Sequence, residues 1–196
     1  MVGTLDRLGL AESTLVFYTA DHGDAIASHG GVFDKDSLMV EETERIPLAV
    51  RWPGRVPPGV ASDRLVTHMD IVPTLLEAAG ADAPSPVDGR SLLPLVESAV
   101  RRTDASWPDD LLCQHHGHGH PCFQRLVCHG LWKYVAHLDD LDELYHLERD
   151  PFELRNCAED PAMADVLRDL RHRLGRLMDT FADTAPDAQR LRHQWA

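Results

Sequence analysis

A short apolar run at residues 15–18 is soon followed by three side chains of types that can bind a metal ion, Asp21, His22 and Asp24. Residues 14–19 contain mainly β-branched and aromatic side chains without polar alternation, which is typical of a strand buried on both faces of a parallel sheet. In open α/β sheets, ligands bind just outside the carboxyl ends of the strands. The sequence therefore predicts a metal or ligand site at the end of this strand.

A second group of reactive side chains lies in the polar loop that comes next. His29 precedes Gly30 and Gly31, whose backbone permits a ligand to approach closely, and Lys35 follows a few residues later. The chain has seventeen Arg but only two Lys, Lys35 and Lys133. Because an ammonium is a compact charge and a guanidinium is a planar fork, each Lys is a candidate for a specific role, although an incidental surface position explains either equally well.

Residues 114–122 form a histidine-rich tract that ends in a cysteine. Imidazole and thiol groups at this density could bind a transition metal. The tract lacks the paired spacing of structural zinc sites, and its glycines make it flexible. Loose metal binding and lining of a substrate pocket are the alternatives. The candidate ligands are His116, His118 and Cys122, with Cys113 or Cys128.

Composition excludes several classes of protein. The net charge of −13 over 196 residues disfavours a nucleic-acid partner, which requires clustered Lys and Arg. No apolar window is long enough to span a membrane, and the N-terminus lacks a signal-peptide pattern, so the chain as given is expected to be cytoplasmic. A signal peptide upstream of Met1 would change this expectation. The four cysteines are expected to be free thiols.

The pattern of elements predicts two parts. The first, residues 1–105, holds the end of a helix at 4–9, apolar strands at 15–19 and 46–51, and helices at 70–79, capped by Asp70 and Gly80, and 91–96. A helix at about residues 36–43 is also expected in the first part. The second, residues 106–196, holds short strands at 111–113, 123–128 and 131–137, the last two forming a hairpin, and a long amphipathic helix from residue 161.

Several motifs in order resemble the C-terminal half of a sulfatase of the alkaline-phosphatase superfamily. They are the segments 14–24, 29–35, 45–54, 70–76, 88–92, 133–135 and 142–154. The resemblance implies an α/β fold with a mixed, mostly parallel sheet flanked by helices, as part of an alkaline-phosphatase-like domain. It also implies a small antiparallel C-terminal subdomain with a terminal helix.

The resemblance further implies hydrolysis of a small-molecule sulfate ester at one divalent metal ion. Asp21 and His22 would be metal ligands; calcium is the family's usual ion, while an imidazole in place of the family's frequent Asn leaves manganese or zinc open. Lys35 and His29 match positions around the sulfate group, where an ammonium stabilises negative charge. In this interpretation His116 or His118 could donate a proton to the leaving group.

The family's nucleophile motif, Cys/Ser-x-Pro-x-Arg, does not occur in this sequence. The chain alone is therefore predicted to be inactive, and its partner would be a missing N-terminal half or another subunit. The opening inside a helix favours the first of these. Hydrolysis of phosphonates or phosphodiesters by the same superfamily remains an alternative, as does a non-catalytic truncated remnant or metal-binding subunit.

Overall fold

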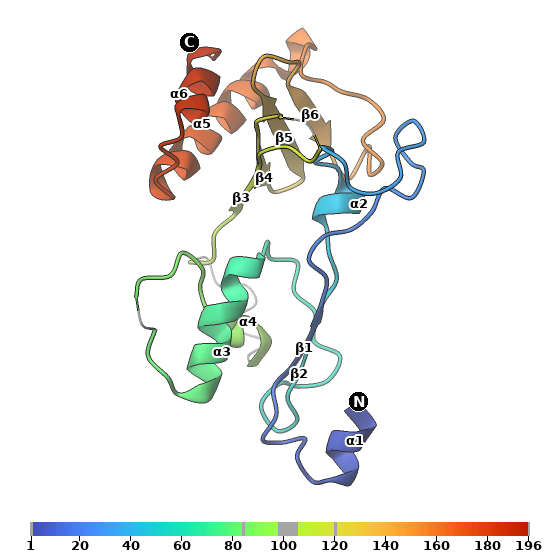
Figure 1. Cartoon of the computed structure of the whole chain (residues 1–196), viewed down its shortest axis with the longest axis vertical. Helices are drawn as coiled ribbons and strands as arrows, with labels where there is room; N and C mark the ends of the chain where they lie inside the picture. The colour runs from blue at the N-terminus through green and yellow to red at the C-terminus, as the bar shows by residue number, and fades with distance from the viewer. Residues whose placement is uncertain (1, 84, 98–105, 120, 196) are drawn as a thin grey trace. The chain divides into compact units, whose positions relative to one another are not determined.

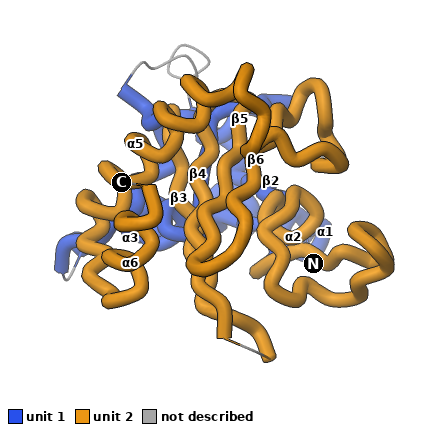
Figure 2. Tube along the Cα trace, turned by 90° about the horizontal axis from the view of Figure 1, so that it is seen from above, with its two compact units in different colours: residues 1–20, 47–108 blue, residues 21–46, 109–196 orange. Residues whose placement is uncertain are grey.

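The computed structural model describes residues 2–83, 85–97, 106–119 and 121–195. The chain forms two compact units, and each contains two separate stretches of sequence (Figure 2). Unit 1 comprises residues 1–20 and 47–108, and unit 2 comprises residues 21–46 and 109–196. This division differs from a single boundary at residue 105, because the segment 21–46 belongs with the C-terminal part. No helix in the described ranges has the length and apolar character needed to cross a bilayer.

Unit 1 contains two strands and several short helices (Figure 1). Phe17, Leu48 and Val66 pack against a small buried core made by Leu92, Leu95 and Trp107. The indole Nε1 of Trp107 donates to the Leu65 carbonyl at 2.9 Å, which holds Trp107 against the segment that precedes η1. The elements of unit 1 are α1 (Val2–Arg7), β1 (Val16–Thr19), β2 (Leu48–Arg51), η1 (His68–Asp70), α3 (Ile71–Ala79) and α4 (Leu93–Glu97).

The expectation of a mostly parallel sheet is wrong for the described residues. Strands β1 and β2 pair antiparallel, with Val16 opposite Arg51 and Thr19 opposite Leu48, and the second sheet is antiparallel as well. Strand β1 is also not buried on both faces, because Tyr18 is 67% exposed while its neighbour Phe17 packs inward. A four-residue strand without polar alternation shows only that its side chains are apolar. Its sequence does not indicate whether the partner strand is parallel or antiparallel.

The predicted ends of helix α3 are only partly confirmed. Gly80 ends the helix in the left-handed conformation, with φ of 63°, as the sequence predicts. Asp70 is the N-cap residue of α3, as predicted, but its side chain makes no capping hydrogen bond to this helix. Its carboxylate instead accepts from the backbone N–H groups of Thr67 and Arg90, at 2.8 and 2.9 Å. Its two acceptor oxygens thus join the start of the helix to the loop that leads into α4.

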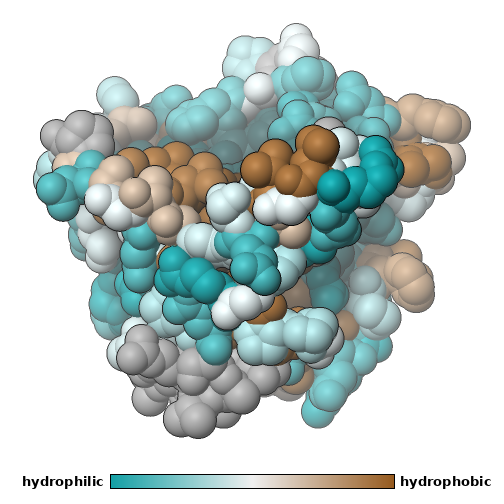
Figure 3. Space-filling model, turned by 90° about the horizontal axis from the view of Figure 1, so that it is seen from below, coloured by the Kyte–Doolittle hydropathy of each residue, from teal (hydrophilic) through white to brown (hydrophobic). Residues whose placement is uncertain are grey.

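Apolar side chains also reach the surface, as the brown regions of Figure 3 show on one face. On α3, Val72 and Leu75 are 54% and 45% exposed, whereas Thr74 between them is fully buried. The hydroxyl of Thr74 accepts from the Leu92 N–H at 2.8 Å, so the inner side of α3 is fixed partly by polar contacts. The outer side of α3 therefore presents apolar surface to solvent in the described chain.

Unit 2 is built on a four-stranded antiparallel sheet in the order β3-β4-β5-β6. Helices α5 and α6 cover one face of this sheet (Figure 1). The predicted hairpin between β4 and β5 is present, and its two-residue turn is Gly130 and Leu131, one residue later than expected, with Gly130 at a φ of 56°. The elements are α2 (Glu41–Glu44), β3 (Asp110–His115), β4 (Gln124–His129), β5 (Trp132–His137), β6 (Glu143–His146), η3 (Pro161–Met163), α5 (Ala164–Thr180) and α6 (Pro186–His193).

The two faces of this sheet bury different partners, because successive side chains of a strand point to opposite sides. Val127 and Tyr134 face the core under α5 and α6, and both are fully buried. Leu126 and Val135 face the other way and pack against Met39, which precedes α2. The segment 21–46 is therefore held against the sheet face opposite the two C-terminal helices.

Candidate functional site

The end of β1 leads directly into the candidate metal ligands. Asp21 and His22 lie two and three residues beyond the strand, and the N–H of Gly23 donates to the Thr43 carbonyl at 2.9 Å. A Cβ atom at position 23 would lie 1.9 Å from the Glu42 carbonyl oxygen. Only glycine permits this close approach of two backbones. The ligand-bearing turn is thus fixed against the start of α2.

The donor atoms of Asp21 and His22 suit a divalent metal ion. Nδ1 of His22 lies 2.7 Å from the Gly23 carbonyl oxygen, so in the tautomer that donates there, Nε2 is free to bind a metal. Nε2 lies 3.7 Å from an Asp21 carboxylate oxygen. An ion with bonds of about 2.1 Å separates neighbouring ligand atoms by roughly 3.0–3.5 Å, which is close to this spacing.

The carboxylate of Asp21 is held in its ionised form. Hydrogen bonds from the backbone N–H groups of His22 and of Asp21 itself lower the pKa of this carboxyl group, and the charges of His22 and Lys35 act in the same direction. The side chain is 90% exposed, so it is open to a ligand. Asp24 lies on the other side of the imidazole, with its Oδ1 atom 3.9 Å from His22 Nδ1.

The Lys35 loop lies beside the histidine tract. Asp34 and Ser37, which flank Lys35, contact His118: the imidazole Nε2 lies 3.8 Å from Asp34 Oδ2, and the His118 N–H donates to Ser37 Oγ at 3.4 Å. Burial lowers the pKa of His115, and the positive charge of Lys35 lowers it further. The loop that carries Lys35 therefore contacts the histidine tract through Asp34 and Ser37.

His29 contacts α2 through Glu42. Its Nε2 lies 3.1 Å from Glu42 Oε2, and its side chain is only 15% exposed. Its backbone has a φ of 46°, a left-handed conformation that costs a non-glycine residue of order 1–2 kcal/mol. His29 thus contacts the helix that supports the site, and the proposed contact with a sulfate group stays a prediction.

The histidine tract forms no cluster of three metal-ligating atoms within the described residues. His115 Nδ1 lies 3.3 Å from Cys122 Sγ, and the His116 ring packs edge-on against Phe123. His120 lies outside the described residues. Cys113 and Cys128 pack into the core beside Met39, where burial raises their pKa values, that of Cys128 to about 12. These two cysteines are therefore unsuited to be ligands for the tract.

The sequence did not predict a buried ion network formed by Lys133, Glu153 and Glu41. The ammonium of Lys133 lies 2.7 Å from Glu153 Oε1 and 3.5 Å from Glu41 Oε1, and the side chains of Lys133 and Glu153 are fully buried. The other oxygen of Glu153 accepts from the Glu41 N–H at 2.6 Å. Burial raises the pKa of Glu153, although Lys133 opposes the shift. The scarcity of lysine was the one available signal for this network.

His29, Glu42 and Glu153 bring three potential ligand atoms within 4.8 Å of one another. Both oxygens of Glu153 are already occupied, one by the Lys133 ammonium and one by the Glu41 N–H. A metal ion would have to displace a buried ammonium there. We therefore assign this group to the ion network that fixes α2 and keep Asp21 and His22 as the candidate ligands.

Comparison with known proteins identifies the family. The sequence model of the family described as N-sulphoglucosamine sulphohydrolase, C-terminal, matches residues 28–180. The chain belongs to the sulfatase family. A curated relative is the N-acetylglucosamine-6-O-sulfatase of Bacteroides thetaiotaomicron, to which this sulfatase chain is 29% identical over 194 residues, covering 95% of the chain and 34% of the relative. Human arylsulfatase K is 32% identical over 163 residues, covering 79% of the chain and 29% of the relative.

A solved structure agrees with this assignment. The complex of BT4656 with its substrate D-glucosamine-2-N,6-O-disulfate superposes with a TM-score of 0.86 at 26% identity, covering 95% of this sulfatase chain and 38% of that chain. The chain thus spans about a third of the length of the curated relatives that it matches. This similarity supports the alkaline-phosphatase-like fold of the sulfatases for the part that the chain covers.

Proposed function

We propose that this chain contributes the metal-binding and sulfate-binding side chains of an enzyme that hydrolyses sulfate esters of sugars. The observation that carries the proposal is the pair of adjacent donors Asp21 and His22, followed in the sequence by Lys35, in a chain of the sulfatase family. The names of a curated relative and of a similar solved structure both refer to sulfated glucosamine derivatives. A sulfated amino sugar is therefore the proposed substrate class.

Each residue has a distinct role in the proposal. Asp21 and His22 hold one divalent ion, with calcium as the first candidate and manganese or zinc as alternatives because of the imidazole. The bound ion would supply Lewis-acid polarisation of a sulfate oxygen. Lys35 places an ammonium where it neutralises negative charge on the ester, and His118, half exposed and oriented by Asp34, can reach a leaving oxygen as a proton donor. His29 positions the loop through Glu42.

The nucleophile does not come from the residues described here, since no Cys/Ser-x-Pro-x-Arg motif occurs in the sequence. We propose that the 196-residue polypeptide by itself does not turn over sulfate esters. Measurable sulfate release by the purified polypeptide would contradict this. Activity assays therefore use the longest natural form of the protein.

The test is sulfate release from N-acetylglucosamine 6-sulfate and from 4-nitrophenyl sulfate. Lys35→Ala should lower kcat by roughly 10²–10³, because it removes one group that stabilises the transition state. Arg149→Ala, an exposed cation elsewhere in unit 2, should leave kcat within twofold. Unchanged kcat in Lys35→Ala would refute the role of Lys35, and faster hydrolysis of a phosphonate monoester than of either sulfate ester would refute the proposed reaction.

The metal is tested separately. Chelation should abolish turnover, and calcium, manganese and zinc are then returned one at a time. Asp21→Ala should raise the metal concentration needed for half-maximal activity, whereas the neighbouring exposed Ile26→Ala should not. Full activity after chelation would refute metal dependence.

A further inference from the structure

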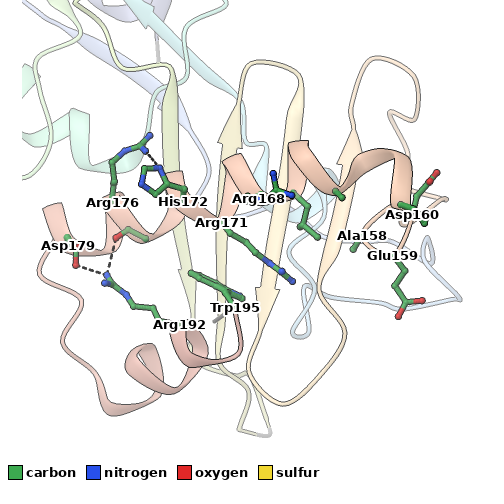
Figure 4. Close-up of a pocket in the computed structure, with 14 residues that line it drawn as sticks. Ala158, Glu159, Asp160, Arg168, Arg171, His172, Arg176, Asp179, Arg192 and Trp195 are labelled. Atoms are coloured by element: carbon green, nitrogen blue, oxygen red, sulfur yellow. Dashed lines mark hydrogen bonds and ion pairs between the residues drawn. The ribbon is translucent and has the colours of Figure 1, made fainter.

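An open groove in unit 2 is lined by five basic and three acidic side chains. It has a volume of about 750 Å³ and lies along α5 and α6 (Figure 4). Arg168, Arg171, His172 and Arg176 project from α5, and Arg192 comes from α6. Side chains three, four and eight residues apart lie on one face of a helix, which explains the row on α5. A local row of cations is notable in a chain whose net charge is −13.

Two of these cations already have structural roles. The Arg171 guanidinium lies 2.6 Å from Asp142 and donates to the Tyr134 hydroxyl at 3.1 Å, which fixes α5 to the sheet. Arg192 lies 2.8 Å from Asp179 and donates to the Gly175 carbonyl at 3.0 Å, which joins α6 to α5.

Arg168 and Arg176 remain available for a ligand. Arg168 pairs with Asp165, but the two side chains are 76% and 91% exposed, so the pair is weak and easily exchanged. Arg176 contacts the imidazole of His172 and, among the described residues, forms no ion pair with a carboxylate. An anion beside Arg176 and His172 would therefore gain charge-assisted hydrogen bonds without breaking an internal ion pair.

The spacing of these cations defines the size of the ligand. Eight residues of α-helix separate Arg168 from Arg176, which corresponds to about 12 Å along the axis. One inorganic sulfate cannot span this length, so the groove suits a ligand with at least two anionic groups. The partly buried indole of Trp195 packs against the core of unit 2 and also lines the groove, where its accessible edge offers apolar surface to a sugar ring.

The acidic residues of the groove also bear on which class of anionic ligand fits it. Glu159, Asp160 and Asp179 also line it, and only Asp179 is paired with a cation of the groove. A nucleic acid has a charge on every unit and few hydroxyl groups that could donate hydrogen bonds to these carboxylates. A sulfated oligosaccharide has neutral hydroxyl groups between its charges, which can donate hydrogen bonds to a carboxylate.

We propose that the groove along α5 and α6 binds a sulfated oligosaccharide, through Arg168 and Arg176, which lie eight residues apart on α5, and through Trp195, which follows α6. The choice of a sulfated ligand rests on the proposed function. The groove would hold a polymeric substrate or product by a part of the sugar chain that is not itself hydrolysed.

The test is calorimetric titration with a heparin-derived hexasaccharide, with the desulfated, N-acetylated hexasaccharide as the ligand control. Arg168→Gln/Arg176→Gln should weaken binding of the sulfated probe at least tenfold. Arg149→Gln/Arg190→Gln removes the same charge from exposed positions outside the groove and should change the affinity less than twofold. Circular dichroism checks that all variants are folded, and Arg176→Lys in place of Arg176→Gln should restore part of the affinity.

Three results would overturn the proposal: equal weakening by the two double variants, equal binding of the desulfated probe, or equal affinity for single-stranded DNA. The last would indicate a general polyanion surface. Binding and catalysis fail separately. Loss of the binding difference with intact sulfate release refutes only the groove, whereas groove-dependent binding without sulfate release in the longest form refutes only the proposed reaction.

Discussion

Replacement of Lys133 by methionine removes the cation of the buried ion network without changing the length of the side chain greatly. The Lys133 ammonium lies 2.7 Å from Glu153, and both side chains are fully buried. At an effective dielectric constant of 20, their attraction is about 6 kcal/mol. The burial of each ion costs several kcal/mol, so the intact pair contributes little net stability.

The single variant loses the attraction but keeps one buried carboxylate. We expect Lys133→Met to lower the free energy of unfolding by about 3–5 kcal/mol at pH 7. Lys133→Met/Glu153→Gln should recover most of this loss, because the glutamine carbonyl can still accept from the Glu41 N–H. Lys35→Met makes the same chemical change at a partly exposed position and should cost less than about 1 kcal/mol.

The assay is guanidinium unfolding followed by circular dichroism, with hydrogen exchange of the β5 amides as a local readout of unit 2. Burial raises the pKa of Glu153 above its ordinary value of 4.5. The ionised carboxylate is therefore the destabilising form, and the loss in Lys133→Met should shrink as the pH falls towards 4.5. A loss below 1 kcal/mol at pH 7, or a double variant whose loss equals the sum of the single losses, would show that the network is not desolvated.

Three further outcomes follow from the structure. Burial raises the pKa of Glu44, so ionisation of this carboxyl group opposes folding. Glu44→Gln should therefore raise the unfolding midpoint at pH 8 and leave it unchanged at pH 4. A midpoint that rises at pH 4 but not at pH 8 would refute this. Gly23→Ala places a Cβ 1.9 Å from a carbonyl oxygen and should weaken metal binding and stability, whereas Gly3→Ala, with open space around it, should alter neither. Asp183→Asn leaves the buried Arg125 guanidinium, now 2.7 Å from Asp183, without its charge partner and should cost about 3–5 kcal/mol in denaturant unfolding; a change under 1 kcal/mol contradicts it.

The sequence predicted the elements whose causes are local. The hairpin between β4 and β5, the glycine that ends α3 and the apolar stripe of α5 each depend on neighbours within a few residues, and all three are present. Strand β6, at Glu143–His146, was not identified from its own residues, because four residues carry too little periodicity. The antiparallel pairing of β1 was missed for the same reason.

The candidate site was predictable only in part. The types and spacing of Asp21 and His22 indicated a metal site, since adjacent donors after a strand are visible in the sequence. The role of Glu153 was not visible, because its contact with Glu41 joins residues 112 positions apart. No local pattern reports a contact of that kind. The partner of His29 was missed for a related reason, since Glu42 becomes its neighbour only when the left-handed loop before it folds back.

The long separation between Glu41 and Glu153 also has a kinetic consequence. The β4–β5 hairpin closes through a two-residue turn, whereas the contact that fixes α2 has to close a loop of about a hundred residues, and distant contacts form slowly. The turn that carries Asp21 and His22 is tied to α2 through Gly23 and Thr43. During refolding, metal affinity should therefore appear after the sheet of unit 2 has acquired its protection from hydrogen exchange.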